Sequence, residues 1–578
     1  MHDLRCRLYG RRSREEDFMQ DFSFAAVFSD HCVLQRGKDI ALFGTAADGA
    51  EIELSLSGAD GMQLAQNSTI ARNGRWELFL PPQSAQDDCT VRAECHAGGT
   101  TETRVLQDIA IGEVWLAGGQ SNMEFELQNC TEGPAELADS EGNGGGKQVR
   151  FYYTNKIGWM DKAFYEAERK TCWQTWQSEA KKSWSAVGYF FARKLAKDLG
   201  VTVGVIGCNW GGTSASAWMR REYLEKDADL SCYLSEYEEA LRGKSVEQQC
   251  AEYDAYEQEN NVWQEKFARM FEKDKNLTWE TAEKVLGKCP WPGPKSCKNP
   301  YRPTGLYDCM VARILPYTLR GVIWYQGESD DHKPASYRKL FTALIENWRA
   351  DWHDPTLPFV FVQLPNHRYQ ADKDFKHWCI IREAQQQVHD SVRNAWMSCA
   401  LDKGQFSDIH PKAKQEVGER LERNALANVY KKAAPDEALS PMLESSRAEK
   451  GRMVLRFRHA DGGFCLRDDA QTLAEYKEME RRQGNTVPAE FTGFELAGID
   501  GVFHPAAFAF GTEDGKASIT LTSPQVSRPL SARYAWFNYG PVTVFGANGL
   551  PLAPFRTDSG QPAQESGHAA IQQIMTVG

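Results

Sequence analysis

The stretch VWLAGGQSNMEF, Val114–Phe125, begins as an apolar run and ends in polar residues that follow two glycines. An apolar run such as Val114–Ala117 is typical of a buried strand, and Gly118 and Gly119 suit a sharp turn. Ser121 therefore follows a strand at the point where a helix is expected. In an open α/β sheet, ligands bind at this edge, beyond the carboxyl ends of the strands. Ser121 is either a nucleophile placed there or a serine that caps the helix.

The bulk composition limits the class of protein. A chain of 578 residues is too long for one hydrophobic core and predicts three or four domains of roughly 150 residues. The net charge of −12 disfavours nucleic acid and anionic membranes as partners. The 15 cysteines form no C-x-x-C pair, so we predict no metal site. The sequence shows neither a signal peptide nor a spanning apolar run, which predicts a cytoplasmic protein with secretion as the alternative.

The hydrophobic pattern divides the chain into three predicted domains. Residues 22–107 alternate apolar and polar positions between turns, which predicts an N-terminal β-domain. Residues 108–432 alternate strands with helices, and this order predicts a mostly parallel sheet with helices on both faces. A Glu-, Lys- and Gln-rich helical insertion at about residues 222–300 interrupts this domain, either as a wall of the site or as a solvated addition. Residues 433–560 predict a C-terminal β-sandwich-like region.

Four polar turns follow predicted strands of the α/β domain. Ser121 follows the first strand, and CNWGGTSASAW (Cys208–Trp218) follows the second. WYQGESDD (Trp324–Asp331) follows the third strand, and FSDIHPKAKQ (Phe406–Gln415) follows the last. Turns after parallel strands converge on one edge of the sheet, so the Ser121 hydroxyl and the His410 imidazole are expected to meet there. A hydroxyl, a base and backbone donors together indicate acyl transfer through a serine.

In this order, the blocks GGQSNM, GGTSASAW, WYQGES and DIHP resemble the SGNH hydrolase superfamily, and specifically the sialate O-acetylesterase family with its carbohydrate esterase relatives. FSDHCVLQRG near the start and RYAWFNYG near the end extend the resemblance over roughly residues 22–558, apart from the insertion. The resemblance implies a flavodoxin-like SGNH hydrolase domain of the α/β class. It also implies a serine esterase that removes O-acetyl groups from carbohydrates through an acetyl-serine intermediate and needs no cofactor.

The resemblance also implies roles for individual residues. Ser121 corresponds to the nucleophile, His410 to the general base and Asp408 to the acid that orients the imidazole. The implied oxyanion hole combines the backbone N–H groups of Ser121 and Gly212 with a side-chain amide. Gln326 is the candidate for that amide, because the third block has Gln where the wider superfamily has Asn. Further supporting or substrate-binding positions are Gln120, Asn122, Gly211, Glu328 and Trp210.

Several alternatives stay open. Superfamily members commonly place the acid three residues before the histidine, where this chain has Ser407, so Asp402 rivals Asp408 and a Ser–His dyad is a third option. Glu328 is either a positioning acid or a structural carboxylate. The alternative substrates to acetylated sialic acid are acetylated oligosaccharides of xylan, mannan or xyloglucan. The alternative to an enzyme is a non-catalytic glycan-binding protein whose β-domains bind the sugar.

Overall fold

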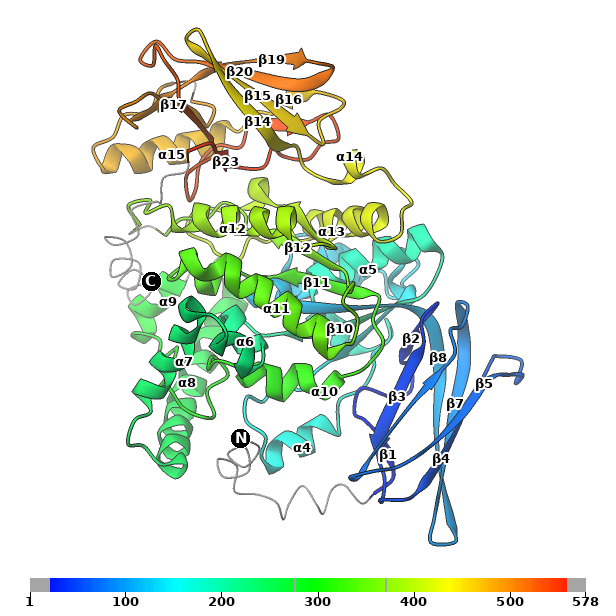
Figure 1. The fold of residues 1–578 in the computed structure, drawn as a ribbon. Coiled ribbons are helices and arrows are strands. Elements are labelled where there is room, and N and C mark those ends of the chain that lie inside the picture. The colour runs from blue at the N-terminus through cyan, green and yellow to red at the C-terminus, as the bar shows by residue number, and fades with distance from the viewer. Residues whose placement is uncertain (1–20, 275–276, 278, 370–371, 490, 559–578) are drawn as a thin grey trace.

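The computed structural model describes residues 21–558 except 275–276, 278, 370–371 and 490 (Figure 1). The N-terminal stretch considered for a signal peptide and positions 559–560 of the predicted C-terminal region lie outside the described residues. In the part of the chain described, no helix combines the length and the apolar character needed to cross a bilayer. The predicted α/β class is confirmed, with a central sheet and additional β-sheet regions.

The N-terminal region is built mainly from antiparallel strands, and β4 shows the burial of alternate side chains. In β4, for example, Ile52, Leu54 and Leu56 are buried, whereas Glu51 and Glu53 face solvent, as expected for a strand covered on one face. A three-stranded sheet of order β1-β3-β6 accompanies the strands that pair around β7. The strands are β1 (Ser23–Phe24), β2 (Val33–Gln35), β3 (Ile40–Thr45), β4 (Glu51–Ser57), β5 (Gln63–Ile70), β6 (Arg75–Leu80) and β7 (Gln86–Ala97).

Strand β8 (Thr100–Gly119) belongs to both the N-terminal region and the central sheet. Its first part pairs antiparallel with β7, and its last part pairs parallel with β10 and β11. Backbone hydrogen bonding is therefore continuous across residue 108, where the predicted domain boundary lies (Figure 1). The domain bounds themselves stay a prediction.

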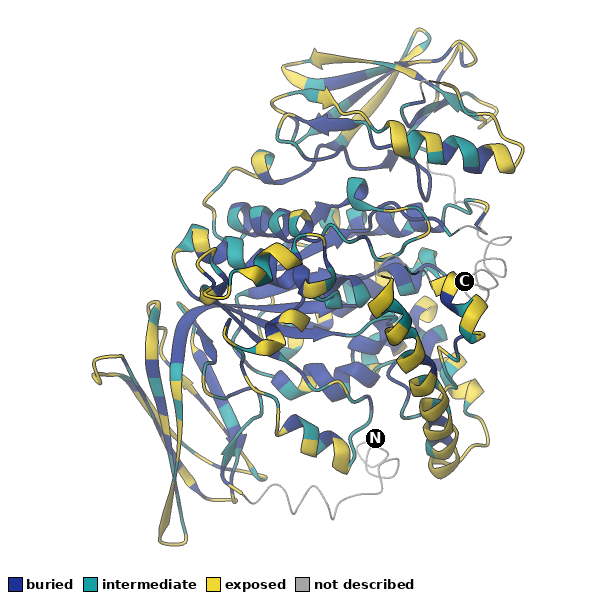
Figure 2. Cartoon of the chain, turned by 180° about the vertical axis from the view of Figure 1, so that it is seen from behind, coloured by how far each residue is buried: buried dark blue, intermediate teal, exposed yellow. Residues whose placement is uncertain are grey.

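The central sheet has the strand order β9-β10-β8-β11-β12-β13, and all of these pairings are parallel. Its strands are almost entirely buried, because helices cover both faces (Figure 2). Parallel pairing also directs the carboxyl ends of these strands to a common edge. The strands that join β8 are β9 (Val149–Tyr153), β10 (Val203–Asn209), β11 (Gly321–Tyr325), β12 (Phe359–Gln363) and β13 (Ala395–Cys399).

Helices α5 (Ala186–Leu199) and α13 (Gln415–Asn428) cover one face of the sheet, and α11 (Tyr337–Asp351) and α12 (His377–Ser391) cover the other. Two tryptophans on neighbouring strands mark the faces. Trp115 of β8 packs edge-on against Phe191 of α5, at a ring distance of 5.1 Å. Trp324 of β11 packs against Phe341 and Trp348 of α11. The short helices of this region are α2 (Ser121–Glu124), α3 (Gly133–Ala138), α4 (Lys162–Glu168) and α10 (Ala312–Ile314).

The insertion between β10 and β11 is helical. Its long helix α8 is capped by Ser245, whose hydroxyl accepts from the Gln248 N–H. Most of α8 faces solvent, and Trp263 packs in a small separate core with Ala282 and Cys289. The helices of the insertion are α6 (Arg221–Glu225), α7 (Ala228–Ala240), α8 (Val246–Lys273) and α9 (Trp279–Leu286).

The C-terminal region has a hydrophobic core of its own, to which Cys399 and Leu401 of the α/β region also belong. These two residues lie at the end of β13, so the C-terminal region packs directly against the start of the loop that carries His410. Its elements are α14 (Pro435–Ala438), β14 (Met442–Glu449), β15 (Arg452–Arg458), β16 (Phe464–Leu466), α15 (Ala470–Arg482), β17 (Phe494–Ala497), β18 (Phe503–Pro505), β19 (Ala507–Glu513), β20 (Lys516–Thr522), β21 (Ser531–Tyr534), β22 (Val544–Gly546) and β23 (Phe555–Arg556).

Candidate active site

The turn after β8 places Ser121 at the first position of α2. Gly119 has φ of +134°, and a Cβ atom there would lie 2.1 Å from the Tyr325 carbonyl oxygen of the neighbouring strand β11. Only glycine fits this close approach. The Gln120 N–H then donates to the same Tyr325 oxygen at 3.1 Å, which fixes the turn to the sheet edge.

Ser121 and His410 meet at this edge, although 289 positions separate them in the sequence. The Ser121 Oγ lies 2.8 Å from the His410 Nε2. Burial is the main cause that lowers the pKa of His410 to about 4, and the nearby Lys414 charge contributes in the same direction, whereas Asp408 acts in the opposite direction. The imidazole is therefore neutral at pH 7, the state in which Nε2 can accept the hydroxyl proton.

The two candidate orienting acids have different surroundings. The Asp408 Oδ1 accepts a hydrogen bond from the His410 backbone N–H at 2.9 Å, and its charge favours the protonated imidazole. Asp402 instead forms a two-pronged ion pair with Arg420, at 2.6 and 2.8 Å. Asp408 is thus the carboxylate whose charge acts on the His410 ring, and it accepts a hydrogen bond from the His410 backbone.

The loop that carries His410 is hydrogen-bonded to the segment that follows β12. The Ser407 N–H donates to the Arg368 carbonyl at 3.2 Å, and Arg368 in turn forms an ion pair with Glu480 of α15 at 2.8 Å. Gly404 packs so closely that a Cβ atom would lie 1.8 Å from the Asn366 oxygen. The C-terminal region therefore helps to fix the position of His410.

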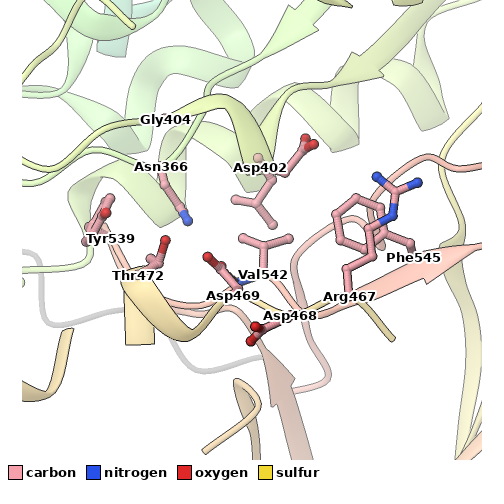
Figure 3. A pocket seen from close by; sticks show the side chains of 11 residues that line it. Asn366, Asp402, Gly404, Arg467, Asp468, Asp469, Thr472, Tyr539, Val542 and Phe545 are labelled. Carbon is pink, nitrogen blue, oxygen red and sulfur yellow. Dashed lines mark hydrogen bonds between the residues drawn. The ribbon is translucent and has the colours of Figure 1, made fainter. Parts of the chain in front are cut away.

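A cavity of about 160 Å³ lies where this loop meets the C-terminal region (Figure 3). Asp402 and Gly404 line it from the α/β side, and Arg467, Asp469 and Tyr539 line it from the C-terminal side. Neither Ser121 nor His410 belongs to its lining, so this cavity is separate from the candidate active site.

Asn122 connects the serine turn to the histidine loop. Its side chain is completely buried, and its Nδ2 donates to Glu328 Oε1 at 2.6 Å and to the Ile409 carbonyl at 2.9 Å. Lys414 donates to the Asn122 Oδ1 at 2.5 Å. Because Ile409 precedes His410 directly, this network holds the two halves of the candidate site together.

Glu328 and Lys414, on either side of Asn122, both titrate close to neutral pH. Burial raises the pKa of Glu328 to about 7 and lowers the pKa of Lys414 to about 7. Each charge partly offsets the cost of burying the other. Lys414 also lies over the ring of Phe125, 4.9 Å from its centre, which favours the ammonium form. Glu328 is one of the supporting residues predicted from the sequence, whereas Lys414 was not predicted.

Backbone donors for an oxyanion come from the first two turns. The Gly211 N–H donates to Glu124 Oε2 at 2.5 Å, so it is already engaged, and Lys156 balances the Glu124 charge. Within residues 21–558 as described, the N–H groups of Ser121 and Gly212 donate to no protein acceptor. Gly212 adopts φ of +73°, a conformation that glycine reaches without strain. These two groups are therefore able to donate to an oxyanion.

Gln326 does not have the geometry of the third oxyanion donor that the sequence predicted. Its Nε2 donates to Asp330 at 2.6 Å and to the Thr213 carbonyl at 3.2 Å, which uses both amide hydrogens. Its Oε1 accepts from the Tyr337 hydroxyl at 3.0 Å. Gln326 therefore joins the second and third turns to each other. Gln120 has a similar supporting place, since its Oε1 accepts from the Ser329 N–H at 3.1 Å.

Aromatic side chains flank the second turn. A Cβ atom on Gly212 would lie 3.0 Å from Trp291 and 3.2 Å from Tyr301, so both rings pack beside this turn. The two rings meet edge-on at 5.8 Å. Trp210 immediately precedes Gly211 and is half-buried. Trp291 lies near the end of the insertion, so the insertion supplies a wall of the candidate site. Trp291 was not predicted as a site residue from the sequence.

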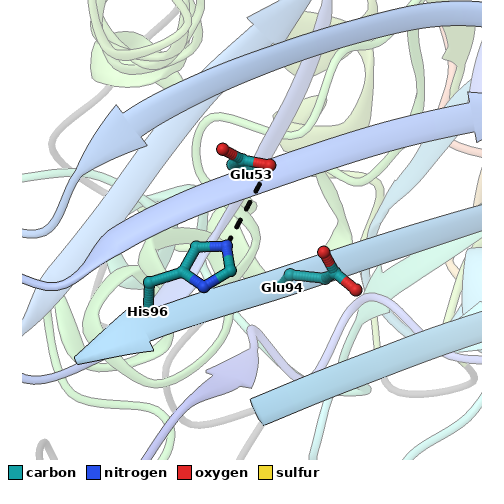
Figure 4. Close-up of side chains that lie close together, drawn as sticks. All are labelled: Glu53, Glu94 and His96. Atoms are coloured by element: carbon teal, nitrogen blue, oxygen red, sulfur yellow. Dashed lines mark ion pairs between the residues drawn. The ribbon is translucent and has the colours of Figure 1, made fainter. Parts of the chain in front are cut away.

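A separate group of potential metal ligands lies on the N-terminal sheet (Figure 4). Ligand atoms of Glu53, Glu94 and His96 lie within 4.8 Å of one another on β4 and β7. Glu94 already forms an ion pair with Arg92 at 2.5 Å, and His96 Nδ1 contacts the Thr101 hydroxyl at 2.9 Å. The Glu53 Oε2 lies 4.0 Å from the His96 Nε2, so each of the three side chains also has a protein partner.

Comparisons with known proteins agree on one family. A family model described as carbohydrate esterase, sialic acid-specific acetylesterase, matches residues 291–427. Mouse sialate O-acetylesterase is 25% identical over 438 residues, which cover 71% of this chain and 74% of the relative. Human sialate O-acetylesterase is 25% identical over 436 residues, or 71% of each chain. The crystal structure of a carbohydrate acetylesterase from Xanthomonas citri matches with a TM-score of 0.67 and 26% identity, covering 93% of this chain and 100% of the other.

Proposed function

We propose, for a chain that belongs to the sialate O-acetylesterase family of carbohydrate esterases, that Ser121 carries the acetyl group during hydrolysis of sugar O-acetyl esters. The observation that carries this proposal is the 2.8 Å distance between the Ser121 Oγ and the His410 Nε2. Family membership makes the chain an enzyme, in place of the non-catalytic glycan-binding protein considered above.

The reaction begins when the Ser121 oxygen attacks the acetyl carbonyl and His410 Nε2 takes the hydroxyl proton. The oxyanion that forms is stabilised by the N–H groups of Ser121 and Gly212. His410 then returns its proton to the leaving sugar oxygen, and the acetyl group stays on Ser121. In the second half, His410 takes a proton from water, the resulting hydroxide attacks the acetyl-serine, and acetate leaves as the proton returns to Ser121.

Asp408 is the group that we propose to stabilise imidazolium. Its charge already favours the protonated ring, and its hydrogen bond to the His410 backbone fixes the spacing between the carboxylate and the histidine. Burial, together with the opposing effect of Lys414, keeps the resting imidazole neutral. This balance suits a group that must accept a proton and release it again.

The architecture that we propose is that of an SGNH hydrolase, with the flavodoxin-like arrangement of a parallel sheet between helical layers. Its support is the order of the parallel strands and the convergence of the serine and histidine turns on one sheet edge. The substrate is an acetylated sugar, and Trp291, Tyr301 and Trp210 offer flat apolar surface for a sugar ring beside the reactive serine. We propose acetylated sialic acid first, following the named relatives, and acetylated plant oligosaccharides as the second candidate.

The test is the variant Ser121→Ala, assayed with p-nitrophenyl acetate and with acetylated sialic acid and xylo-oligosaccharides. We expect loss of hydrolysis with an unchanged thermal unfolding transition, because the change removes one oxygen from a half-buried position. Ser235→Ala, on the exposed side of α7, is the matched control and should retain full activity. Normal turnover by Ser121→Ala would refute the proposed nucleophile.

A cytoplasmic location is also a proposal. Its support is the set of cysteines, because those in the described part of the chain are free thiols. Fractionation of cells that express the full-length protein tests it, and recovery outside the cytoplasm would contradict it.

A further inference from the structure

Two cysteines of the insertion lie in contact at the base of the aromatic wall. Cys250 is on α8 and Cys297 lies between α9 and Tyr301, and their sulfur atoms are 3.7 Å apart. Both residues are half-buried, so small reagents can reach them from solvent. We define the wall segment as residues 289–301, which includes Cys297 together with Trp291 and Tyr301.

The backbone on each side of the pair is already fixed to α8. The Ser296 hydroxyl donates to the Gln249 carbonyl at 2.9 Å, and the Cys297 N–H donates to the Gln249 Oε1 at 3.0 Å. One residue further on, Lys298 forms an ion pair with Asp254 of the same helix. The main chains at both cysteines are thus held in register, and bond formation requires the sulfurs to approach from 3.7 Å to about 2.05 Å.

We propose that Cys250 and Cys297 are a covalent modification site, at which a small disulfide such as oxidised glutathione converts the pair into an intrachain disulfide that fastens the wall segment to α8. The bond would join the helix to the segment that carries Trp291 and Tyr301. It would therefore restrict the part of the insertion that packs against Gly212, beside Ser121.

The exchange proceeds in two balanced steps. The Cys297 thiolate attacks one sulfur of oxidised glutathione, its S–S bond breaks, and one glutathione thiolate leaves. Cys250 then loses its proton to solvent and attacks the Cys297 sulfur, which expels the second glutathione. The chain loses two protons and two electrons, and the oxidant takes up both to become two glutathione molecules.

The order of the two steps follows from the surroundings of the sulfurs. Burial and the neighbouring Cys297 raise the pKa of the Cys250 thiol to about 11, which disfavours its thiolate. Cys250 is therefore the poorer first nucleophile, and we assign the first attack to its contact partner Cys297. Cys250 reacts only after Cys297 has formed a mixed disulfide with glutathione. The Cys250 sulfur lies 3.7 Å from the Cys297 sulfur that it then attacks.

The effect on substrates rests on the proposed function, whereas the covalent step does not. A wall held in place before binding lowers the entropy lost when a sugar ring packs against it. We expect the oxidised protein to show a lower KM for acetylated oligosaccharides. The KM for p-nitrophenyl acetate should not change, because this small ester lacks a sugar ring.

The experiment treats the full-length protein with oxidised glutathione, blocks remaining thiols by alkylation, and maps peptides by mass spectrometry without reduction. We expect a peptide that links Cys250 to Cys297, lighter by two hydrogens and separated by dithiothreitol. Cys172 and Cys465 are exposed and serve as the positive control, because glutathione adducts on them show that the reagent has reacted with accessible thiols.

Two serine variants test the order and the pairing. Cys250→Ser should stop at a stable glutathione adduct on Cys297, and Cys297→Ser should leave Cys250 unmodified. Glutathione adducts on Cys172 without the linked peptide would overturn the proposal, as would a linkage of either cysteine to another position. An unchanged KM for acetylated oligosaccharides after complete oxidation would refute the effect on the wall, and Ser121→Ala separately decides whether the esterase site itself is as proposed.

Discussion

Replacing Asn122 with alanine removes the side chain that joins the serine turn to the histidine loop. The change deletes hydrogen bonds to Glu328, Lys414 and the Ile409 carbonyl, all within 2.5–2.9 Å. Hydrogen bonds to charged groups contribute about 1.5–3 kcal/mol each and a neutral one about 1 kcal/mol, so we expect the free energy of unfolding to fall by about 4–7 kcal/mol. Stability of folded proteins is typically about 5–15 kcal/mol, so a loss of this size removes a large fraction of it.

The same change releases Ile409 and, with it, the neighbouring His410. A misplacement of about 1 Å at reacting atoms costs on the order of 10²-fold in rate, so kcat for p-nitrophenyl acetate should fall about 100-fold with little change in KM. Urea unfolding gives the stability, and kinetics at 10 °C keep the variant folded during the assay. The temperature is chosen near the stability maximum of typical proteins, at about 10–20 °C.

Glu328→Gln is the matched control for Asn122→Ala. Glutamine keeps the oxygen that accepts from Asn122 and keeps the side-chain volume, so the bridge to Ile409 remains. We expect kcat within a few-fold of the wild type and a smaller loss of stability. If Asn122→Ala retains full kcat while folded, or if Glu328→Gln is equally impaired, the bridge does not position His410 as argued.

Three further results are expected. With the pKa of His410 at about 4, kcat/KM for p-nitrophenyl acetate should be constant from pH 5 to 7 and fall about tenfold per pH unit below 4, as the base becomes protonated; a midpoint near 6.5 would contradict this burial effect. Asp408→Asn should lower kcat by about 10²- to 10⁴-fold, because imidazolium loses its stabilising charge. Asp402→Asn should lower the melting temperature and leave kcat unchanged, because Asp402 is paired with Arg420. Equal losses of kcat in the two variants would contradict the assignment of Asp408 as the orienting acid. Gly211→Ala places a Cβ atom 3.3 Å from the Ser121 Cβ and should lower kcat without unfolding the protein, as circular dichroism and kinetics together can show.

The meeting of Ser121 and His410 could be predicted because it depends on local patterns and one rule of topology. Each polar turn follows an apolar strand in the sequence, and parallel strands direct such turns to one sheet edge. The α/β class followed from the same alternation of strands and helices. The roles of the two residues in catalysis stay predictions that the variants above test.

The long strand β8 was harder to foresee. Its sequence changes after residue 108 from mostly polar residues that are exposed or half-buried to a mainly apolar run that is buried. The change occurs because the strand leaves a solvent-exposed part of the N-terminal sheet and enters a sheet covered on both faces. A change of environment along one strand therefore gives the same pattern as a domain boundary.

The partners of several site residues depend on long-range packing that leaves no local pattern. Lys414 stands in the polar run KAKQ and resembles a solvated residue at the start of a helix, yet it is completely buried beside Asn122. Gln326 follows a strand as a donor should, but Asp330 and Thr213 occupy its amide. Only the three-dimensional arrangement distinguishes an amide that faces the substrate from one that supports the turn.

The protonation states of the buried Lys414 and Glu328 influence the pKa of His410. With both pKa values at about 7, acidification below this range leaves a charged Lys414 beside a neutral Glu328, and this excess positive charge holds the pKa of His410 down. Above pH 7 the pair becomes neutral or negative, and the positive charge that weakens His410 disappears. The imidazole is then a stronger proton acceptor than it is at lower pH. Asn122 keeps this pair at hydrogen-bond distance from both turns, so the electrostatic link and the geometric link to Ser121 depend on the same side chain.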